Sequence, residues 1–345
     1  MPATIPDVFS ASYEEARERF RALTRDVPHG ALEVVDGLTI DWAWTGDPEA
    51  RDVAVFTSGL HGVEGFAGSA AQLSLLADRG DTPTLWVHAL NPWGMKHIRR
   101  VNENNVDLNR NFLAAGEAYA GANAHYVAMN TLLNPGTPPG LDAFWPRAAL
   151  YLARHGFKAL KNAVVGGQYD FPQGLFFGGR GLERAPGLLL DFLVPQLANR
   201  ARVVHVELHT GIGPRGGITK LLEGNPDEEQ LARVRACFGA DVGAWDPDNP
   251  DAYGIRGGMT RALADALPGV RYDALTCEFG TRSNLAVLHA LREENRLHQW
   301  GVPTPDHPAK RGLIEAFAPT DAAWRATVPV HARDLYDSAC RLLSA

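Results

Sequence analysis

Four apolar segments that read as strands, with helix-like stretches between them, constrain the fold of this chain most. They are Val53–Thr57, Thr84–Leu90, Arg202–Leu208 and Arg271–Phe279. Val53–Thr57, which is apolar with β-branched residues, and Thr84–Leu90 fit strands buried on both faces of a sheet. A strand, a helix and a further strand in succession are typical of an α/β protein. We therefore expect a mixed, mostly parallel sheet with helices on both faces.

The organisation of the 345 residues indicates one domain. We find no repeat, no low-complexity tract and no linker long enough to separate two domains. The segment from Glu117 to Pro195 is less regular, because Gly- and Pro-rich stretches interrupt its helix-like parts. We expect a single domain over residues 1–345, with an elaboration at about 117–195.

Composition and charge exclude several classes of protein. Lys and Arg number 33 and Asp and Glu 40, a formal charge of −7, whereas proteins that bind nucleic-acid phosphates usually carry a basic excess. No apolar run approaches the roughly 18 residues of a transmembrane helix, and residues 1–10 do not resemble a secretory signal. The three cysteines are far apart in the sequence, which fits reduced thiols. We expect a cytoplasmic protein with no nucleic-acid or membrane partner; the oligomeric state does not follow from the sequence.

Potential metal ligands follow two of the buried strands. His61 and Glu64 lie three residues apart in a Gly-flanked turn after the first of these strands, where α/β sheets carry functional loops. His209 ends a second strand at the same edge. His₂Glu is a common ligand set of catalytic zinc, because it leaves a fourth position for water. A polar loop without metal is the alternative, and His205, deeper in the strand, is expected to be a packed residue or a partner of the ligands.

Glu278 is the one acid among residues 275–281, at the end of the last apolar strand. A buried carboxylate is costly unless it is paired or lies near a metal. At the carboxyl end of the strand, Glu278 could act as a general base with a shifted pKa. The alternative is an ion pair with Arg282 or another cation.

A polar, Asn-rich loop between residues 99 and 112 carries four side chains that could bind an anion: Arg99, Arg100, Asn109 and Arg110. A guanidinium group can hold a carboxylate through two parallel hydrogen bonds. The alternative is a solvated basic loop.

Taken together, these motifs resemble the zinc carboxypeptidase (carboxypeptidase A-like) family. The matching elements, in order, are His-x-x-Glu at 61–64, Asn-Pro-x-Gly at 91–94, Asp-Leu-Asn-Arg-Asn-Phe at 107–112, a later His, and a Glu at a strand end. Tyr253 and the Gly-Gly pair at 257–258 also resemble the family's tyrosine-bearing loop. The resemblance implies a phosphorylase/hydrolase-like fold and one zinc ion per chain, held by His61, Glu64 and His209.

The resemblance also implies roles in catalysis. Glu278 would take a proton from water and deliver it to the leaving amine. Arg100 would polarise the scissile carbonyl and stabilise its oxyanion; Arg99 is the alternative, because the spacing in this loop varies within the superfamily.

Substrate binding follows from the same resemblance. Asn109 and Arg110 would bind the substrate's free carboxylate, and Tyr253 would close over the substrate. The family's specificity pocket would include Met259 and Thr260, with no acidic residue nearby, which disfavours a pocket specific for lysine or arginine.

The resemblance therefore predicts hydrolysis of an amide next to a free carboxylate in a small molecule or peptide. A metallocarboxypeptidase is the first expectation. The residues of these motifs are more similar to those of a bacterial branch whose substrates are not settled. They also have some similarity to the succinylglutamate desuccinylase and aspartoacylase branch. An N-acyl amino acid deacylase is therefore the alternative, and a non-catalytic zinc-binding or peptide-binding domain is a third hypothesis.

Overall fold

The structure is a computed structural model that describes residues 8–223, 226–244 and 256–345, without the side chains of residues 157–165. Its centre is an eight-stranded sheet with the strand order β1-β2-β4-β3-β5-β8-β6-β7. The strands are β1 (His29–Val35), β2 (Leu38–Thr45), β3 (Asp52–Ser58), β4 (Thr84–His88), β5 (Arg202–Thr210), β6 (Ile218–Leu222), β7 (Gly243–Ala244) and β8 (Arg271–Phe279). Strands β4, β3, β5 and β8 are parallel to one another, and the pairs β1–β2, β2–β4 and β6–β8 are antiparallel. The expected mixed, mostly parallel sheet is confirmed.

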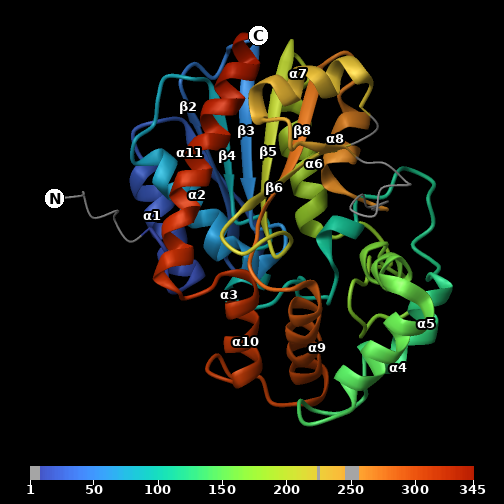
Figure 1. Cartoon of the computed structure of the whole chain (residues 1–345). Coiled ribbons are helices and arrows are strands. Elements are labelled where there is room, and N and C mark those ends of the chain that lie inside the picture. Colours follow the sequence, from blue (N-terminus) through green and yellow to red (C-terminus); the bar gives the residue numbers. More distant parts are fainter. Residues whose placement is uncertain (1–7, 224–225, 245–255) are drawn as a thin grey trace.

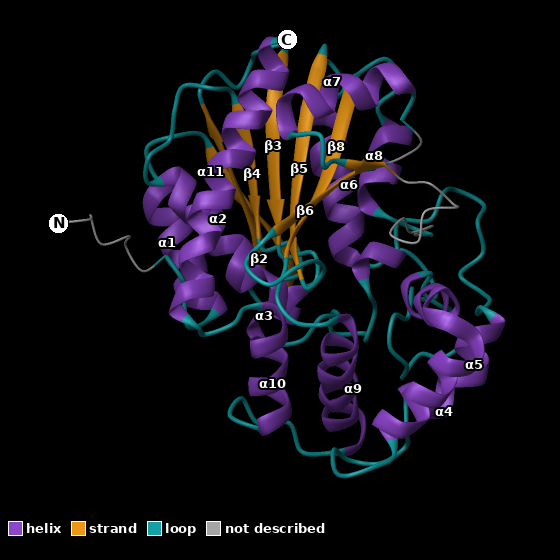
Figure 2. Cartoon of the chain, viewed as in Figure 1, coloured by secondary structure: helices purple, strands orange, loops and turns teal. Residues whose placement is uncertain are grey.

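Helices cover both faces of this sheet (Figures 1 and 2). They are α1 (Tyr13–Thr24), α2 (Gly65–Leu76), α3 (Pro92–Lys96), α4 (Ala124–Leu133), α5 (Phe144–Val165), α6 (Arg184–Leu197), α7 (Glu228–Phe238), α8 (Met259–Ala266), α9 (Asn284–Trp300), α10 (Pro308–Phe317) and α11 (Ala322–Ser344), with short 3₁₀ turns at Gly62–Glu64 and Leu108–Arg110. Among the described helices, none combines the length and the apolar composition needed to cross a membrane.

Strand β3 shows why the central strands read as continuous apolar runs. Ala54 and Phe56 point into the core shared with α1, α2 and α11, whereas Val53 and Val55 point into the core shared with α6 and α8. A strand covered by helices on both faces has no solvent-facing side, so alternation between polar and apolar residues disappears.

The differences from expectation lie at the edges of the molecule. Strand β6 was not expected, because most of its residues are half-buried and it lacks an apolar run. Helix α4 begins only at Ala124, although the sequence from Glu117 to Leu133 has a helix-like pattern. Gly121 interrupts it with a φ of +97°, and the Asn123 side chain caps the helix by accepting a hydrogen bond from the His125 amide at 2.8 Å.

Candidate metal centre

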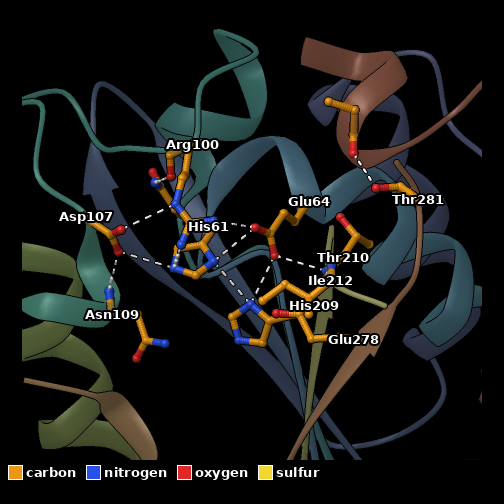
Figure 3. A network of polar contacts seen from close by, with 12 residues as sticks. His61, Glu64, Arg100, Asp107, Asn109, His209, Thr210, Ile212, Glu278 and Thr281 are labelled. Carbon is orange, nitrogen blue, oxygen red and sulfur yellow. Dashed lines mark hydrogen bonds and ion pairs between the residues drawn. The ribbon is translucent and has the colours of Figure 1, made fainter. Parts of the chain in front are cut away.

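The carboxyl ends of β3 and β5 bring His61, Glu64 and His209 together in a buried cluster (Figure 3). His61 and Glu64 lie on the tight turn that follows β3, whereas His209 belongs to β5 itself. The turn requires glycine at position 62, where φ is +40° and a Cβ atom would lie 2.2 Å from the carbonyl oxygen of Arg99. The sequence of the turn thus permits the close backbone approach that directs both side chains inward.

The three potential ligand atoms converge on one point. The two Nδ1 atoms of His61 and His209 lie 3.1 Å apart, and they lie 3.1 and 3.0 Å from the two carboxylate oxygens of Glu64. Tetrahedral zinc, with bonds of about 2.0–2.2 Å, would separate its ligand atoms by roughly 3.3 Å. Each Nδ1 offers one proton or one lone pair but faces two partners, so a cation satisfies the cluster better than hydrogen bonds do. The donor set and its spacing therefore fit zinc.

Glu64 is available as an anionic ligand. Burial raises the pKa of this carboxyl, but His61, His209 and Arg100 lower it more strongly, so the net pKa lies well below the usual value. The Arg100 guanidinium donates a hydrogen bond to Glu64 Oε1 at 2.7 Å and contacts Asp107 Oδ2 at 3.3 Å. Arg100 therefore places a positive charge directly beside the ligand cluster.

Arg99 and Arg100, the two candidates for stabilising the oxyanion, point in different directions. Arg99 is only 1% exposed, and its Nε donates to Glu294 Oε1 at 2.9 Å. Lys310 binds the same carboxylate oxygen at 2.7 Å. Arg99 thus anchors the loop to α9 and α10 and lies outside the cluster, whereas Arg100 lies in it.

Glu278 lies beside the cluster on the neighbouring strand. It pairs in register with His209, and its carboxylate accepts a hydrogen bond from the Ile212 amide at 3.4 Å. Burial, reinforced by the nearby Glu64 charge, raises the pKa of Glu278 to about 7. The suggested pairing with Arg282 is not observed, because Arg282 lies 3.5 Å from Glu315 instead. A carboxyl group with this pKa can accept and release a proton near neutral pH.

Asn109 and Arg110 form a buried turn on the other side of the cluster. The Asp107 carboxylate accepts a hydrogen bond from the Asn109 amide at 3.1 Å, and Asn109 Oδ1 accepts one from the Met259 amide at the start of α8. Arg110 is 3% exposed, and burial lowers the pKa of its guanidinium. The loop is therefore an internally bonded turn rather than a solvated basic loop. Tyr253 lies outside the described residues.

Glu223 is a residue near this site that the sequence did not indicate. Its amide donates to the carbonyl of Ala274 at 2.9 Å. Because Thr219 pairs with Glu278 and side chains alternate along a strand, Glu223 lies on the same face as Glu278. Burial raises the pKa of Glu223, while a hydrogen bond from Thr276 and the charge of Arg110 lower it. Glu223 is therefore a buried acidic residue on the face of the sheet that carries Glu278. It follows the unexpected strand β6, so no motif marked it.

Comparisons with known proteins agree with this architecture. The chain belongs to the family described as "Protein of unknown function (DUF2817)", whose model matches residues 9–331. No curated protein matches it in sequence. The chain has a carboxypeptidase-like α/β fold. The crystal structure of thrombin activatable fibrinolysis inhibitor is similar with a TM-score of 0.55 and 13% identity, covering 99% of this chain and 78% of that chain.

Two further solved structures are similar at lower TM-scores. Carboxypeptidase A from Helicoverpa armigera has a TM-score of 0.46 and 14% identity, covering 94% of this chain and 73% of that chain. Murein-tripeptide amidase MpaA from Escherichia coli O157 has a TM-score of 0.40 and 19% identity, covering 80% of this chain and 95% of that chain.

Proposed function

We propose that the protein is a zinc-dependent hydrolase that cleaves an amide bond next to a free carboxylate, with metallocarboxypeptidase activity as the first candidate. One observation carries this proposal: one ligand atom each of His61, Glu64 and His209 lie within 4.8 Å of one another, and Glu278 lies beside them on the adjacent strand. Three protein ligands and a neighbouring base form a hydrolytic site rather than a structural zinc site.

Each residue of the site has a separate role in the proposed reaction. Zinc at these ligands would supply a Lewis acid and lower the pKa of a coordinated water to about 7. Glu278 accepts a proton from the attacking water and passes it to the leaving amine. Arg100 donates hydrogen bonds to the carbonyl oxygen as negative charge develops on it. Asn109 and Arg110 hold the free carboxylate, and Tyr253 closes over the substrate.

The alternative is an N-acyl amino acid deacylase with small substrates. The observation that favours a deacylase is the packing of the 117–195 segment against the Asn-rich loop between residues 99 and 112. Tyr169 donates a hydrogen bond to the Arg110 carbonyl at 2.7 Å, and Asn111 donates to the carbonyls of Gly178 and Gly181 at 2.8 and 2.9 Å. We propose that this segment is an elaboration of the single domain that limits the length of the substrate.

A substrate panel tests the function and separates the two candidates. Zinc-loaded protein is assayed with dipeptides, longer peptides with free or amidated carboxyl ends, and N-acyl amino acids. A carboxypeptidase should cleave the longer peptides with a free carboxyl end, whereas a deacylase should prefer the N-acyl amino acids. A zinc-loaded protein that cleaves none of these amides would support the non-catalytic hypothesis.

Replacing Arg110 with alanine should weaken hydrolysis of substrates with a free carboxylate by about 2–5 kcal/mol in transition-state free energy, because a buried charge pair is lost. Arg110→Lys should rescue activity only partly, since an ammonium group cannot form two parallel hydrogen bonds. Values of kcat/KM for matched free-acid and amidated substrates are the measurement. Equal slowing of both substrates would show that Arg110 supports the loop instead of reading the carboxylate.

Glu223 suggests the chemistry of the preferred side chain. We expect substrates with a cationic side chain next to the free carboxylate to be favoured, because Glu223 places a carboxylate on the site-facing side of the sheet. Glu223→Gln should reduce kcat/KM for a C-terminal lysine substrate by about 1.5–3 kcal/mol, as expected for a hydrogen bond to a charged group. The matched leucine substrate is the control and should change little; an equal loss for both would contradict this role.

A further inference from the structure

We propose that Glu207 is a positioning residue for the metal site: its buried carboxylate lies against Nε2 of His209, favours the proton on that nitrogen and so leaves the Nδ1 lone pair for the metal. The proposal rests on the proposed zinc centre and adds a residue to which the resemblance assigned no role. Its consequence is a change in metal affinity, which can be measured without any substrate.

The contact joins two buried side chains on one face of β5. Glu207 and His209 are two residues apart, so their side chains point the same way. Glu207 Oε1 lies 2.8 Å from His209 Nε2, as a charge contact rather than a hydrogen bond, and the two residues are 1% and 2% exposed. An imidazole that carries its proton on Nε2 keeps the lone pair on Nδ1. That Nδ1 is the atom that faces His61 and Glu64.

Glu207 needs this partner, because the structure gives it no other cation. Within the described part of the chain, no lysine or arginine forms an ion pair with Glu207. The imidazole below it, His205, is bonded at both nitrogens, to the Tyr272 hydroxyl at 2.6 Å and the Thr57 hydroxyl at 2.8 Å. Burial also lowers the pKa of His205 to about 4, so this ring is neutral. A buried carboxylate without compensation is strongly unfavourable.

The second imidazole ligand has a carboxylate on the same side of its ring. His61 Nε2 lies 3.2 Å from Asp107 Oδ1 and 2.8 Å from a nitrogen of the Arg100 guanidinium. Carboxylates behind metal-binding histidines fix the tautomer and raise the basicity of the ligand.

The test is the affinity for Zn²⁺, measured by competition with a chromogenic chelator. Glu207→Gln keeps the shape of the side chain but removes its charge, and we expect the affinity to fall about 10- to 100-fold. Glu207→Asp keeps the charge on a shorter side chain and should retain part of the zinc affinity that Glu207→Gln loses. Glu294→Gln is the matched control, because Glu294 is also buried and ion-paired, with Arg99 and Lys310. It should lower the melting temperature and leave zinc affinity unchanged.

Glu207→Gln binding zinc as tightly as the wild type, with only a lower melting temperature, would overturn the proposal. If that variant fails to fold, long-range ¹H–¹⁵N spectra of the zinc-loaded wild type decide: we expect the His209 proton on Nε2, and a proton on Nδ1 would exclude this role. Wild-type protein that binds no divalent metal would instead refute the zinc site on which the proposed function depends.

Discussion

Replacing His61 or His209 with alanine should remove the metal ion from the protein. Elemental analysis should give about one zinc per chain for the wild type and almost none for either variant. The reason is that the cluster has three ligands, and no fourth His, Cys, Asp or Glu joins them among the described residues. Metal binding that depends on three protein ligands is severely weakened when one is lost.

The control for this experiment is His125→Ala, which deletes an imidazole outside the cluster. His125 lies at the start of α4, where its ring contacts the Tyr151 hydroxyl at 2.7 Å. This variant should keep its zinc. Full retention of zinc by both the His61 and the His209 variants would refute the ligand assignment.

Replacing Glu278 with glutamine should preserve the fold and the bound metal but lower kcat by about 10²–10⁴-fold, because glutamine cannot accept the proton. The measurements are kcat, zinc content and melting temperature. Glu315→Gln, which changes a carboxylate that pairs with Arg282, is the control and should remain active. If Glu278 only stabilises the fold, the variant should melt earlier while turnover per folded molecule survives.

The pH dependence provides a second test of Glu278. The ionised form is the base, so activity should fall as the pH decreases through the pKa of Glu278. The protein groups raise the pKa of Glu278 to about 7, and a bound dication lowers it, so this loss should begin at or below pH 7. The acid limb should be absent from the residual activity of Glu278→Gln.

Short sequence patterns predict several local elements of the fold. Ser12 accepts a hydrogen bond from the Glu15 amide at 3.1 Å and caps α1, as the pattern Ser-x-x-Glu predicts. Asp36 and Gly37 have the positive φ angles, 50° and 74°, of the hairpin turn that an Asp-Gly pair predicts. These features depend on residues close in sequence, so the pattern of a short segment is sufficient to predict them.

The central strands and the placement of the potential ligands were also predictable, for a topological reason. Strands buried on both faces show unbroken apolar runs, and parallel strands bring their carboxyl ends to one edge of the sheet. His61 and Glu64 after β3, and His209 and Glu278 at the end of β5 and β8, therefore had to come close together once the strands were identified.

By itself, the sequence thus determined the central strands, the edge at which the site lies and the kinds of residue gathered there. Only the tertiary structure decided which arginine belongs to the site: Arg99 is bound by Glu294, 195 residues further along the chain, while Arg100 turns to Glu64. It also brought Glu223 to the site face through the edge strand β6. Partners so distant in sequence meet through the packing of whole elements, and no local pattern of residues encodes that packing.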